Sequence, residues 1–121
     1  MKKAPYFSGS VIADWLDNSK RNMRTMSMIY YVDSKGKKWV VPRWSLINGA
    51  SIPRFLWWIC SPFVGKYRRA SVIHDYYHNT KERPSKETHW MFYDAMICDG
   101  VNIIKAKAMY YAIKTLGKDW D

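Results

Sequence analysis

The chain has 121 residues and carries 20 Lys and Arg against 10 Asp and Glu, so its formal net charge is +10 at neutral pH. This length supports one compact domain, and we expect residues 1–121 to form it. Because 48% of the residues are hydrophobic and 17% are aromatic, the composition excludes an intrinsically disordered basic tail.

The chain up to residue 47 is predicted to form mainly strands. An early strand is indicated within residues 6–15. Residues 26–32 are rich in β-formers, turn-forming residues follow at 33–36, and a second strand resumes at 37–41 before Pro42 closes it. The two later segments predict a β-hairpin.

From Asn48 onward the chain is predicted to be mainly helical. Helical segments are indicated over residues 67–79, 85–98 and 102–116, and residues 54–59 are predicted to form a short helix or a buried turn. Ser51 and Pro53 suit the start of the first helix, and Ser85 is a favourable N-cap for the third. Gly100 is expected to end the third helix, and Gly117 to cap the last. The predicted fold class is α+β, with an N-terminal antiparallel hairpin or small sheet packed on a C-terminal bundle of three to four helices.

The N-terminus and the longest apolar stretch bear on export and membranes. Residues 1–5 are charged like the start of a signal peptide, but polar residues from Ser8 onward interrupt the apolar run that should follow. The longest apolar stretch, at 55–60 and just beyond, is far shorter than the roughly 20 residues of a membrane span. We therefore expect neither a cleaved signal peptide nor a transmembrane segment.

The two cysteines, Cys60 and Cys98, lie far apart in the sequence and form no C-x-x-C pattern. Two apolar residues precede each of them, so they are predicted to be buried free thiols in a reducing compartment. The alternative is a disulfide, which requires the two residues to meet in the fold.

The basic charge is spread along the chain. Its local groups lie at 20–24, 35–38, 66–69 and 105–107, and none reaches the roughly five or six like charges of a binding tail. A solvated basic surface is the favoured interpretation, although such a surface could attract an acidic partner, an anionic membrane surface or nucleic acid. Base stacking would need aromatics among exposed Lys or Arg, and only the region of Trp39 and Trp44 offers them. Nucleic-acid binding is not favoured, because the positive charge is not concentrated in one part of the chain.

All three histidines, His74, His78 and His89, fall within a window of 16 residues. His74 and His78 are four residues apart, so they share one face of the predicted helix 67–79. The short connection to the next helix predicts antiparallel packing that brings His89 toward this face. Three histidines with an open fourth position are the ligand set of a catalytic zinc ion, which acidifies water. The alternatives are acid–base chemistry without a metal, or an exposed His78 beside two hydrogen-bonded core histidines.

The pair His74-Asp75 is a second candidate feature. His74 could act as a general base if a carboxylate oriented its far nitrogen. Adjacent residues on a helix point about 100° apart, so this carboxylate should come from elsewhere, for example from Asp94. Asp75 could instead form a structural salt bridge with Arg54, Arg68 or Arg69.

The segment Asn48-Gly49-Ala50-Ser51 is predicted to bring a polar side chain and bare backbone N–H groups near the helical site. Alternatively, Gly49 serves only a turn that needs a positive φ. Ser51 has weak support as a nucleophile because no G-x-S-x-G motif surrounds it.

Several ordered motifs carry a resemblance to a known family. They are Val41-Pro42, Asn48 to Arg54, Tyr67 to Ala70, His74-Asp75-Tyr76, Phe92-Tyr93-x-Ala95-Met96 and Asp99-Gly100-Val101. Over residues 39–117 the chain resembles the domain-of-unknown-function 1353 family, which is common among bacteriophage and prophage proteins. The usual pattern of that family has Asp at the position of Asn48 and Ala-Asp at that of Thr88-His89. The resemblance implies a phage protein with a polar site at these positions.

A helix with His-Asp that faces a second helix with Asp is similar, at the level of helices, to the catalytic pair of phospholipase A2. With His89 in place of the facing Asp, such a dyad would lose its orienting carboxylate. A metal site would keep its ligand count, because Asn48 and His89 replace carboxylates while His78 adds a nitrogen donor. The departures therefore favour a metal over the dyad, and they also permit a purely structural polar cluster.

The leading hypothesis is a small phage-type hydrolase that activates water against an ester, amide or phosphate bond. Its catalytic residues would be His74, Asp75, His89 and Asn48, and its candidate metal is zinc, held by His74, His78 and His89. Its substrate would be an unidentified small molecule, lipid or peptide. The alternative is a non-catalytic phage accessory or virion protein that binds a phage or host component through a basic, aromatic surface. Either protein would act in the host cytoplasm or the virion.

Overall fold

The computed structural model describes residues 3–16, 22–49, 51–52, 56, 65–116 and 120. Its strands are β1 (Tyr6–Phe7), β2 (Ala13–Trp15), β3 (Met23–Thr25), β4 (Ile29–Val32), β5 (Lys38–Val41) and β6 (Leu46–Ile47). A short 3₁₀ turn at Gly65–Tyr67 leads into the helices, which are α1 (Arg68–Thr80), α2 (Ser85–Cys98) and α3 (Ile103–Leu116). The predicted α+β class is confirmed, with strands in the N-terminal half and three packed helices after them.

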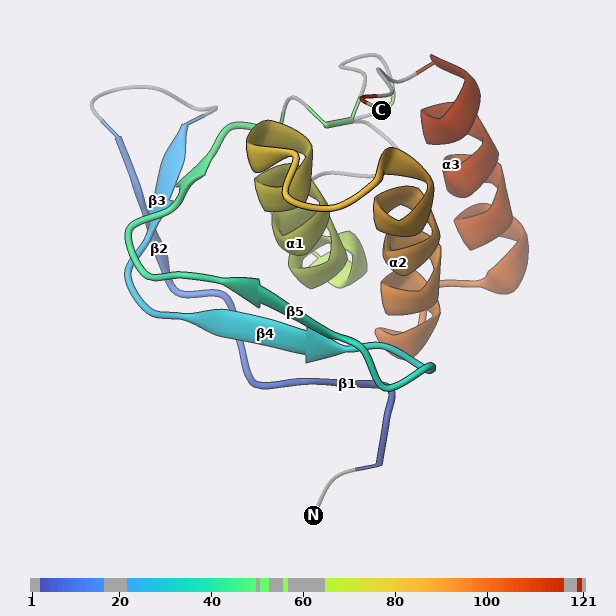
Figure 1. Ribbon diagram of the computed structural model, residues 1–121, viewed down its shortest axis with the longest axis horizontal. Coiled ribbons are helices and arrows are strands. Elements are labelled where there is room, and N and C mark those ends of the chain that lie inside the picture. The colour runs from blue at the N-terminus through green and yellow to red at the C-terminus, as the bar shows by residue number, and fades with distance from the viewer. Residues whose placement is uncertain are drawn as a thin grey trace.

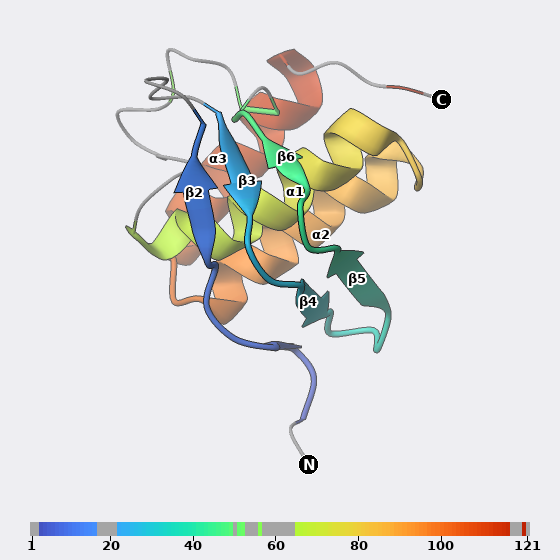
Figure 2. The ribbon, with the colours of Figure 1, turned by 90° about the vertical axis from the view of Figure 1, so that its left-hand side faces the viewer.

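The strands form two antiparallel three-stranded sheets, in the orders β1-β4-β5 and β2-β3-β6. Helix α1 packs against both sheets, α2 packs on α1, and α3 packs on α2 (Figure 1). Turned by 90°, the molecule presents the strands in front and the helices behind them (Figure 2). The interface between α1 and α2 therefore lies in the middle of the fold.

The predicted hairpin is confirmed as β4 and β5, which pair from Ile29 opposite Val41 to Val32 opposite Lys38. The Asp33 carboxylate holds its turn together. One oxygen of Asp33 accepts hydrogen bonds from the backbone N–H groups of Lys35 and Lys37, each at 2.9 Å, and the other accepts one from Trp39 Nε1 at 2.9 Å. Gly36 supplies the positive φ, +83°, that the turn requires.

The early strand predicted within residues 6–15 is wrong as one element. Two short strands occupy this range, β1 and β2, and they belong to different sheets. The break lies at Ser8-Gly9-Ser10, where the chain leaves β4. There the Arg69 guanidinium donates a hydrogen bond to the Gly9 carbonyl oxygen at 3.1 Å, so the peptide is satisfied outside a sheet.

The helix boundaries follow the sequence within a residue or so, with one correction. Ser85 is the first residue of α2, and its N-cap is Pro84, whose carbonyl accepts the Thr88 N–H at 3.0 Å. Proline suits this place because it has no N–H to leave unpaired. Gly100 ends α2 with φ of +85° as expected. Asn102 caps α3 by accepting the Ile104 N–H at 2.8 Å.

Several sequence predictions fall on residues that are not described. The short helix predicted over 54–59 lies outside the described residues except for Leu56, and so do Cys60 and the capping Gly117. Cys98 has a free thiol and is half-buried, so it is less buried than predicted. Within the part of the chain that the structure describes, no helix is long and apolar enough to cross a membrane.

The core lies between the sheets and the α1–α2 pair. Its fully buried side chains include Tyr31 and Trp39 from the first sheet, Ile47 from the second, and Ile73 and Phe92 from the helices. Trp39 is only 1% exposed, so of the two tryptophans in the candidate base-stacking region only Trp44, at 51%, reaches the surface. The Trp39 indole is needed in the core because it binds Asp33 and packs edge-on against Tyr77, with ring centroids 4.9 Å apart.

Candidate functional site

Two buried imidazoles meet at the α1–α2 interface. His74 on α1 is fully buried and His89 on α2 is 2% exposed, and His74 Nε2 lies 3.0 Å from His89 Nδ1. The antiparallel packing predicted from the short connection therefore does bring these two side chains together. Phe92 packs against the His74 ring, with centroids 4.9 Å apart. The pair sits in a buried, partly apolar setting, which disfavours the charged form of the His74 ring.

The hydrogen bond between the rings fixes their protonation. One of the two nitrogens must carry the proton and the other must be bare, so the pair cannot form this bond with both rings fully protonated. Burial, helped by the neighbouring His89 and His78, lowers the pKa of His74 well below its usual range. His74 Nδ1 is buried and has no hydrogen-bond partner among the described residues.

His78 lies one turn beyond His74 on the same face of α1, with ring centroids 6.4 Å apart. Burial lowers the pKa of His78, while Asn79 and Asp75 oppose that effect. The indole of Trp120 contacts both His78 and His89 edge-on, at centroid distances of 5.4 and 5.6 Å. Trp120 is itself held by a 2.7 Å hydrogen bond from its Nε1 to the Arg83 carbonyl. One aromatic side chain thus covers two of the three histidines.

Asp75 points away from His74, toward the segment after β6. Its carboxylate accepts hydrogen bonds from the backbone N–H groups of Asn48 at 3.0 Å and Ser51 at 3.1 Å, and from Asn79 Nδ2 at 3.1 Å. The backbone N–H groups of this segment thus reach α1, where Asp75 binds them, and Gly49 has the positive φ, +73°, of the alternative interpretation as a turn. Burial raises the pKa of Asp75, and the two backbone N–H groups oppose this.

The proposed salt bridge between Asp75 and Arg69 is wrong. Arg69 pairs with Asp99 instead, with its Nε 3.1 Å from one carboxylate oxygen and its Nη2 on the other. Asp94 also lies elsewhere, because it accepts hydrogen bonds from the Tyr31 hydroxyl at 2.6 Å and from the backbone and hydroxyl of Ser34. Among the described residues, neither Asp75 nor Asp94 is hydrogen-bonded to His74. Neither carboxylate therefore orients the His74 ring.

The candidate site thus has two linked parts. The His74–His89 pair faces α2, and Asp75 with Asn48 and Asn79 forms a polar cluster toward the β6 segment, where Asn79 Nδ2 is 3.5 Å from Asn48 Oδ1. His78 is electrostatically linked to both parts, because its charge interacts with Asp75, His74 and His89. The residues that sequence reasoning missed are Trp120 and Asn79. Asn79 is four residues from Asp75, a helical spacing that could have revealed it.

Acid should destabilise the protein through His74. Its folded-state pKa is depressed, so its contribution to stability is present above the unfolded value of about 6.5 and is lost as the pH falls below it. We expect the free energy of unfolding to fall by up to about 1.4 kcal/mol per pH unit below pH 6.5 from this group alone. Urea titrations between pH 7.5 and 5.5 with a chelator present measure the slope. In His74→Phe, which offers Phe92 an aromatic partner, the slope should shrink. An unchanged slope would contradict the assignment.

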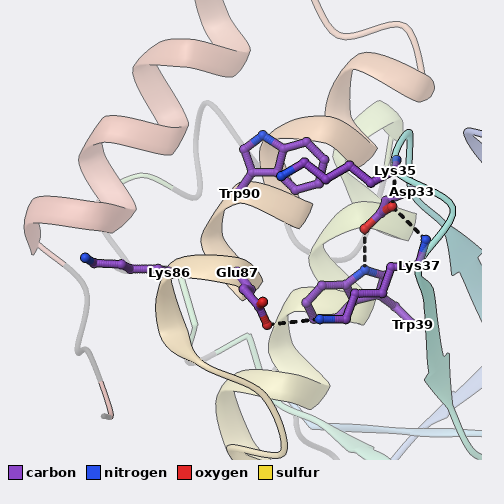
Figure 3. A pocket seen from close by; sticks show the side chains of 7 residues that line it. All are labelled: Asp33, Lys35, Lys37, Trp39, Lys86, Glu87 and Trp90. Atoms are coloured by element: carbon purple, nitrogen blue, oxygen red, sulfur yellow. Dashed lines mark hydrogen bonds and ion pairs between the residues drawn. The ribbon is translucent and has the colours of Figure 1, made fainter.

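A second concave region lies between the β4–β5 turn and α2. It is a cavity of about 200 Å³ lined by Asp33, Lys35, Lys37, Trp39, Lys86, Glu87 and Trp90 (Figure 3). Lys37 donates to Glu87 at 3.0 Å, and the Lys35 ammonium lies 4.2 Å from the Trp90 ring centroid. Asp33 is occupied by the turn and by Trp39. Opposite charges largely compensate each other in this cavity.

Comparison with known proteins places the chain in a family. Residues 23–113 match the family described as protein of unknown function (DUF1353). The chain belongs to this family. The matched range contains every candidate residue considered above except Trp120, so the histidine pair and the Asp75 cluster are parts of the DUF1353 region.

Two relatives of this DUF1353 chain come from Sinorhizobium fredii and are both uncharacterized proteins. The protein y4jT is 43% identical over 116 residues, which cover 94% of this chain and 34% of y4jT. The protein y4iH is 42% identical over 95 residues, which cover 74% of this chain and 38% of y4iH. The chain thus spans little more than a third of the length of these relatives. No solved structure matches it.

Proposed function

We propose that the chain acts as a small hydrolase whose site is built on the His74–His89 pair, with zinc as its candidate metal. The observation that carries this proposal is the 3.0 Å contact between two imidazole nitrogens that are both buried. Buried polar side chains need a reason to be retained, because apolar residues of similar size fill a helix interface at no desolvation cost. A functional site that needs nitrogen ligands for a metal ion, or a proton acceptor, would supply such a reason.

The spacing of the two nitrogens suits a metal ion. With Zn–N bonds of about 2.0–2.1 Å and tetrahedral angles, two ligand nitrogens lie about 3.3 Å apart, close to the observed 3.0 Å. His74 and His89 would hold the ion, and His78 is the candidate third ligand. As the side chains stand, the described residues contain no group of three His, Cys, Asp or Glu that could hold a metal ion. A bound zinc ion would supply Lewis acidity that lowers the pKa of water toward neutrality.

The other residues would position and shield this pair. Trp120 covers His78 and His89 and limits the access of bulk water. Asp75 binds the backbone N–H groups of Asn48 and Ser51, so its role would be to position this segment beside α1. Without a metal, the same pair could still accept a proton from water, because each ring can stabilise the other through their hydrogen bond. In both forms the bond attacked would be an ester, amide or phosphate bond.

Metal content tests the proposal most directly. Untagged protein, purified without chelator and analysed by elemental mass spectrometry, should contain about one equivalent of zinc. His74→Ala and His89→Ala should each weaken zinc binding by more than about 100-fold, because each removes a ligand. Thr88→Ala is the matched control, since the Thr88 hydroxyl donates a 2.9 Å hydrogen bond to the carbonyl of Pro84, the N-cap of the same helix. Zinc should be retained in that variant.

A folded protein without zinc, or one that keeps its zinc in both histidine variants, would overturn the zinc site. The second candidate function, a non-catalytic phage or virion protein that binds a phage or host component, would then be preferred. A surface feature supports it. Trp44 is 51% exposed and adopts a φ of +70°, and Arg43 stacks on its ring at 4.2 Å. A bulky residue held in the left-handed region is a strained arrangement that proteins keep mostly at functional sites.

A further inference from the structure

A pocket between α2 and α3 leads to the histidine pair. It has a volume of about 210 Å³, and its lining includes Lys86 and His89 from α2 and Tyr110 and Lys114 from α3. His89 is 2% exposed, so the little surface that it presents borders this pocket. Because Nδ1 of the same ring contacts His74, the pocket and the buried pair share one side chain.

Among the described residues that line this pocket, all the charges are positive. Two lysines line it, and no carboxylate is found among its described lining residues. The neighbouring cavity behaves differently, because Asp33 and Glu87 line it and Glu87 pairs with Lys37. Lys86 borders both spaces, but its side chain extends away from Glu87 and the two tryptophans, toward the side of α3 (Figure 3). Its ammonium group is thus placed to add to the positive field between α2 and α3.

Tyr110 gives the pocket an aromatic wall. The Tyr110 ring is half-buried and packs against Tyr93, with ring centroids 5.7 Å apart. The Lys114 ammonium lies 5.7 Å from the centroid of the Tyr110 ring. A ring fixed by neighbours is a suitable surface for the organic part of a ligand. The volume is below the roughly 300–1,000 Å³ of pockets for drug-sized molecules, so the ligand should be small.

We propose that this pocket binds the phosphate group of a small phosphomonoester, with Lys86 and Lys114 as its cationic partners and Tyr110 against its organic part. The charges support this choice, since two ammonium groups complement a dianion and lysine binds phosphate as a point charge. The proposal rests on the hydrolase function above and names its substrate class. A phosphomonoester held here lies next to His89, where water activated by the histidine pair would be needed.

Binding of phenyl phosphate to metal-free protein tests this proposal. At pH 8 the probe is a dianion, and isothermal titration gives its affinity while NMR shows whether His89 and Tyr110 respond. The double variant Lys86→Gln/Lys114→Gln should weaken binding by at least about tenfold. The control Lys105→Gln/Lys107→Gln removes the same charge from exposed positions of α3. Lys107 lies about 10 Å along the helix from Lys114, beyond the Debye length at physiological salt, so its loss should cost less than about twofold.

An equal loss of phenyl phosphate affinity in the two double variants would overturn the proposal, because it would indicate that the probe is attracted by the overall positive charge of the protein. Equal affinity for phenyl sulfate, which has a similar shape and a single charge, would also overturn it. The absence of metal separates this test from the zinc test. Phenyl phosphate binding in a protein that has no zinc site would support the pocket and contradict the zinc-dependent hydrolase. A zinc site in a protein that does not bind phenyl phosphate would support the zinc-dependent hydrolase and contradict this substrate class.

Discussion

Asp75→Ala is expected to lower the free energy of unfolding by about 3 kcal/mol. The substitution removes the acceptor of the Asn48 and Ser51 N–H groups and of the Asn79 amide. Each buried donor left without a partner costs about 1–3 kcal/mol, and relief from burying the carboxylate offsets part of the sum. Urea unfolding at pH 7.5, followed by circular dichroism, measures the change.

Two further variants make this result specific. Asp75→Asn keeps the shape but turns an acceptor into a donor that faces other donors, so it should lose at least half as much stability as the alanine variant. Asp14→Asn changes an exposed carboxylate on β2 and should stay within about 0.5 kcal/mol of the parent. A loss below about 1 kcal/mol for Asp75→Ala would show that the segment after β6 is held by other contacts.

Arg69→Ala should lower the free energy of unfolding by a similar amount, about 3 kcal/mol. Its guanidinium joins α1 to two distant parts of the chain. It pairs with Asp99 after α2, and in the N-terminal segment it donates to the Gly9 carbonyl and lies 4.3 Å from the centroid of the Phe7 ring. The Arg69 side chain is 34% exposed but that of Asp99 only 9%, so the loss of Arg69 leaves a shielded carboxylate poorly compensated. The same urea titration measures the effect.

Arg69→Lys should recover less than half of this loss, because lysine keeps the charge but cannot bind the carboxylate through two nitrogens. Arg43→Ala is the matched control. Arg43 also stacks on an aromatic ring, that of Trp44 at 4.2 Å, but it does so on the surface. It should cost less than about 1 kcal/mol. Equal losses in Arg69→Ala and Arg43→Ala would contradict the role of Arg69 as a joint between β1 and the helices.

Local signals in the sequence sufficed for the hairpin and the helices. The turn at Asp33–Gly36 and the caps at Gly100 and Asn102 involve residues close together in the sequence, so they can be recognised from the sequence alone. The second sheet was not predictable in the same way. Strands β2, β3 and β6 have only two or three residues each, too few to show an alternating pattern.

The site was partly predictable for the same reason. The spacing of His74 and His78 and the short turn before α2 were enough to bring His89 toward His74. The partners of Asp75 were not, because its carboxylate reaches 24 and 27 positions back to two backbone N–H groups that carry no side-chain signature. The contact of Trp120 with the histidines was not predictable either, because Trp120 is far from them in the sequence and reaches them only through the fold.

The central position of α1 has a consequence for synthesis on the ribosome. All six strands precede α1 in the chain, yet both sheets pack on it, and strands of two to four residues are not stable without an apolar partner. The nascent chain should therefore gain no lasting structure while its first half emerges. Folding should begin only when α1 and α2 have left the exit tunnel, and a fragment that ends before residue 68 should remain unfolded.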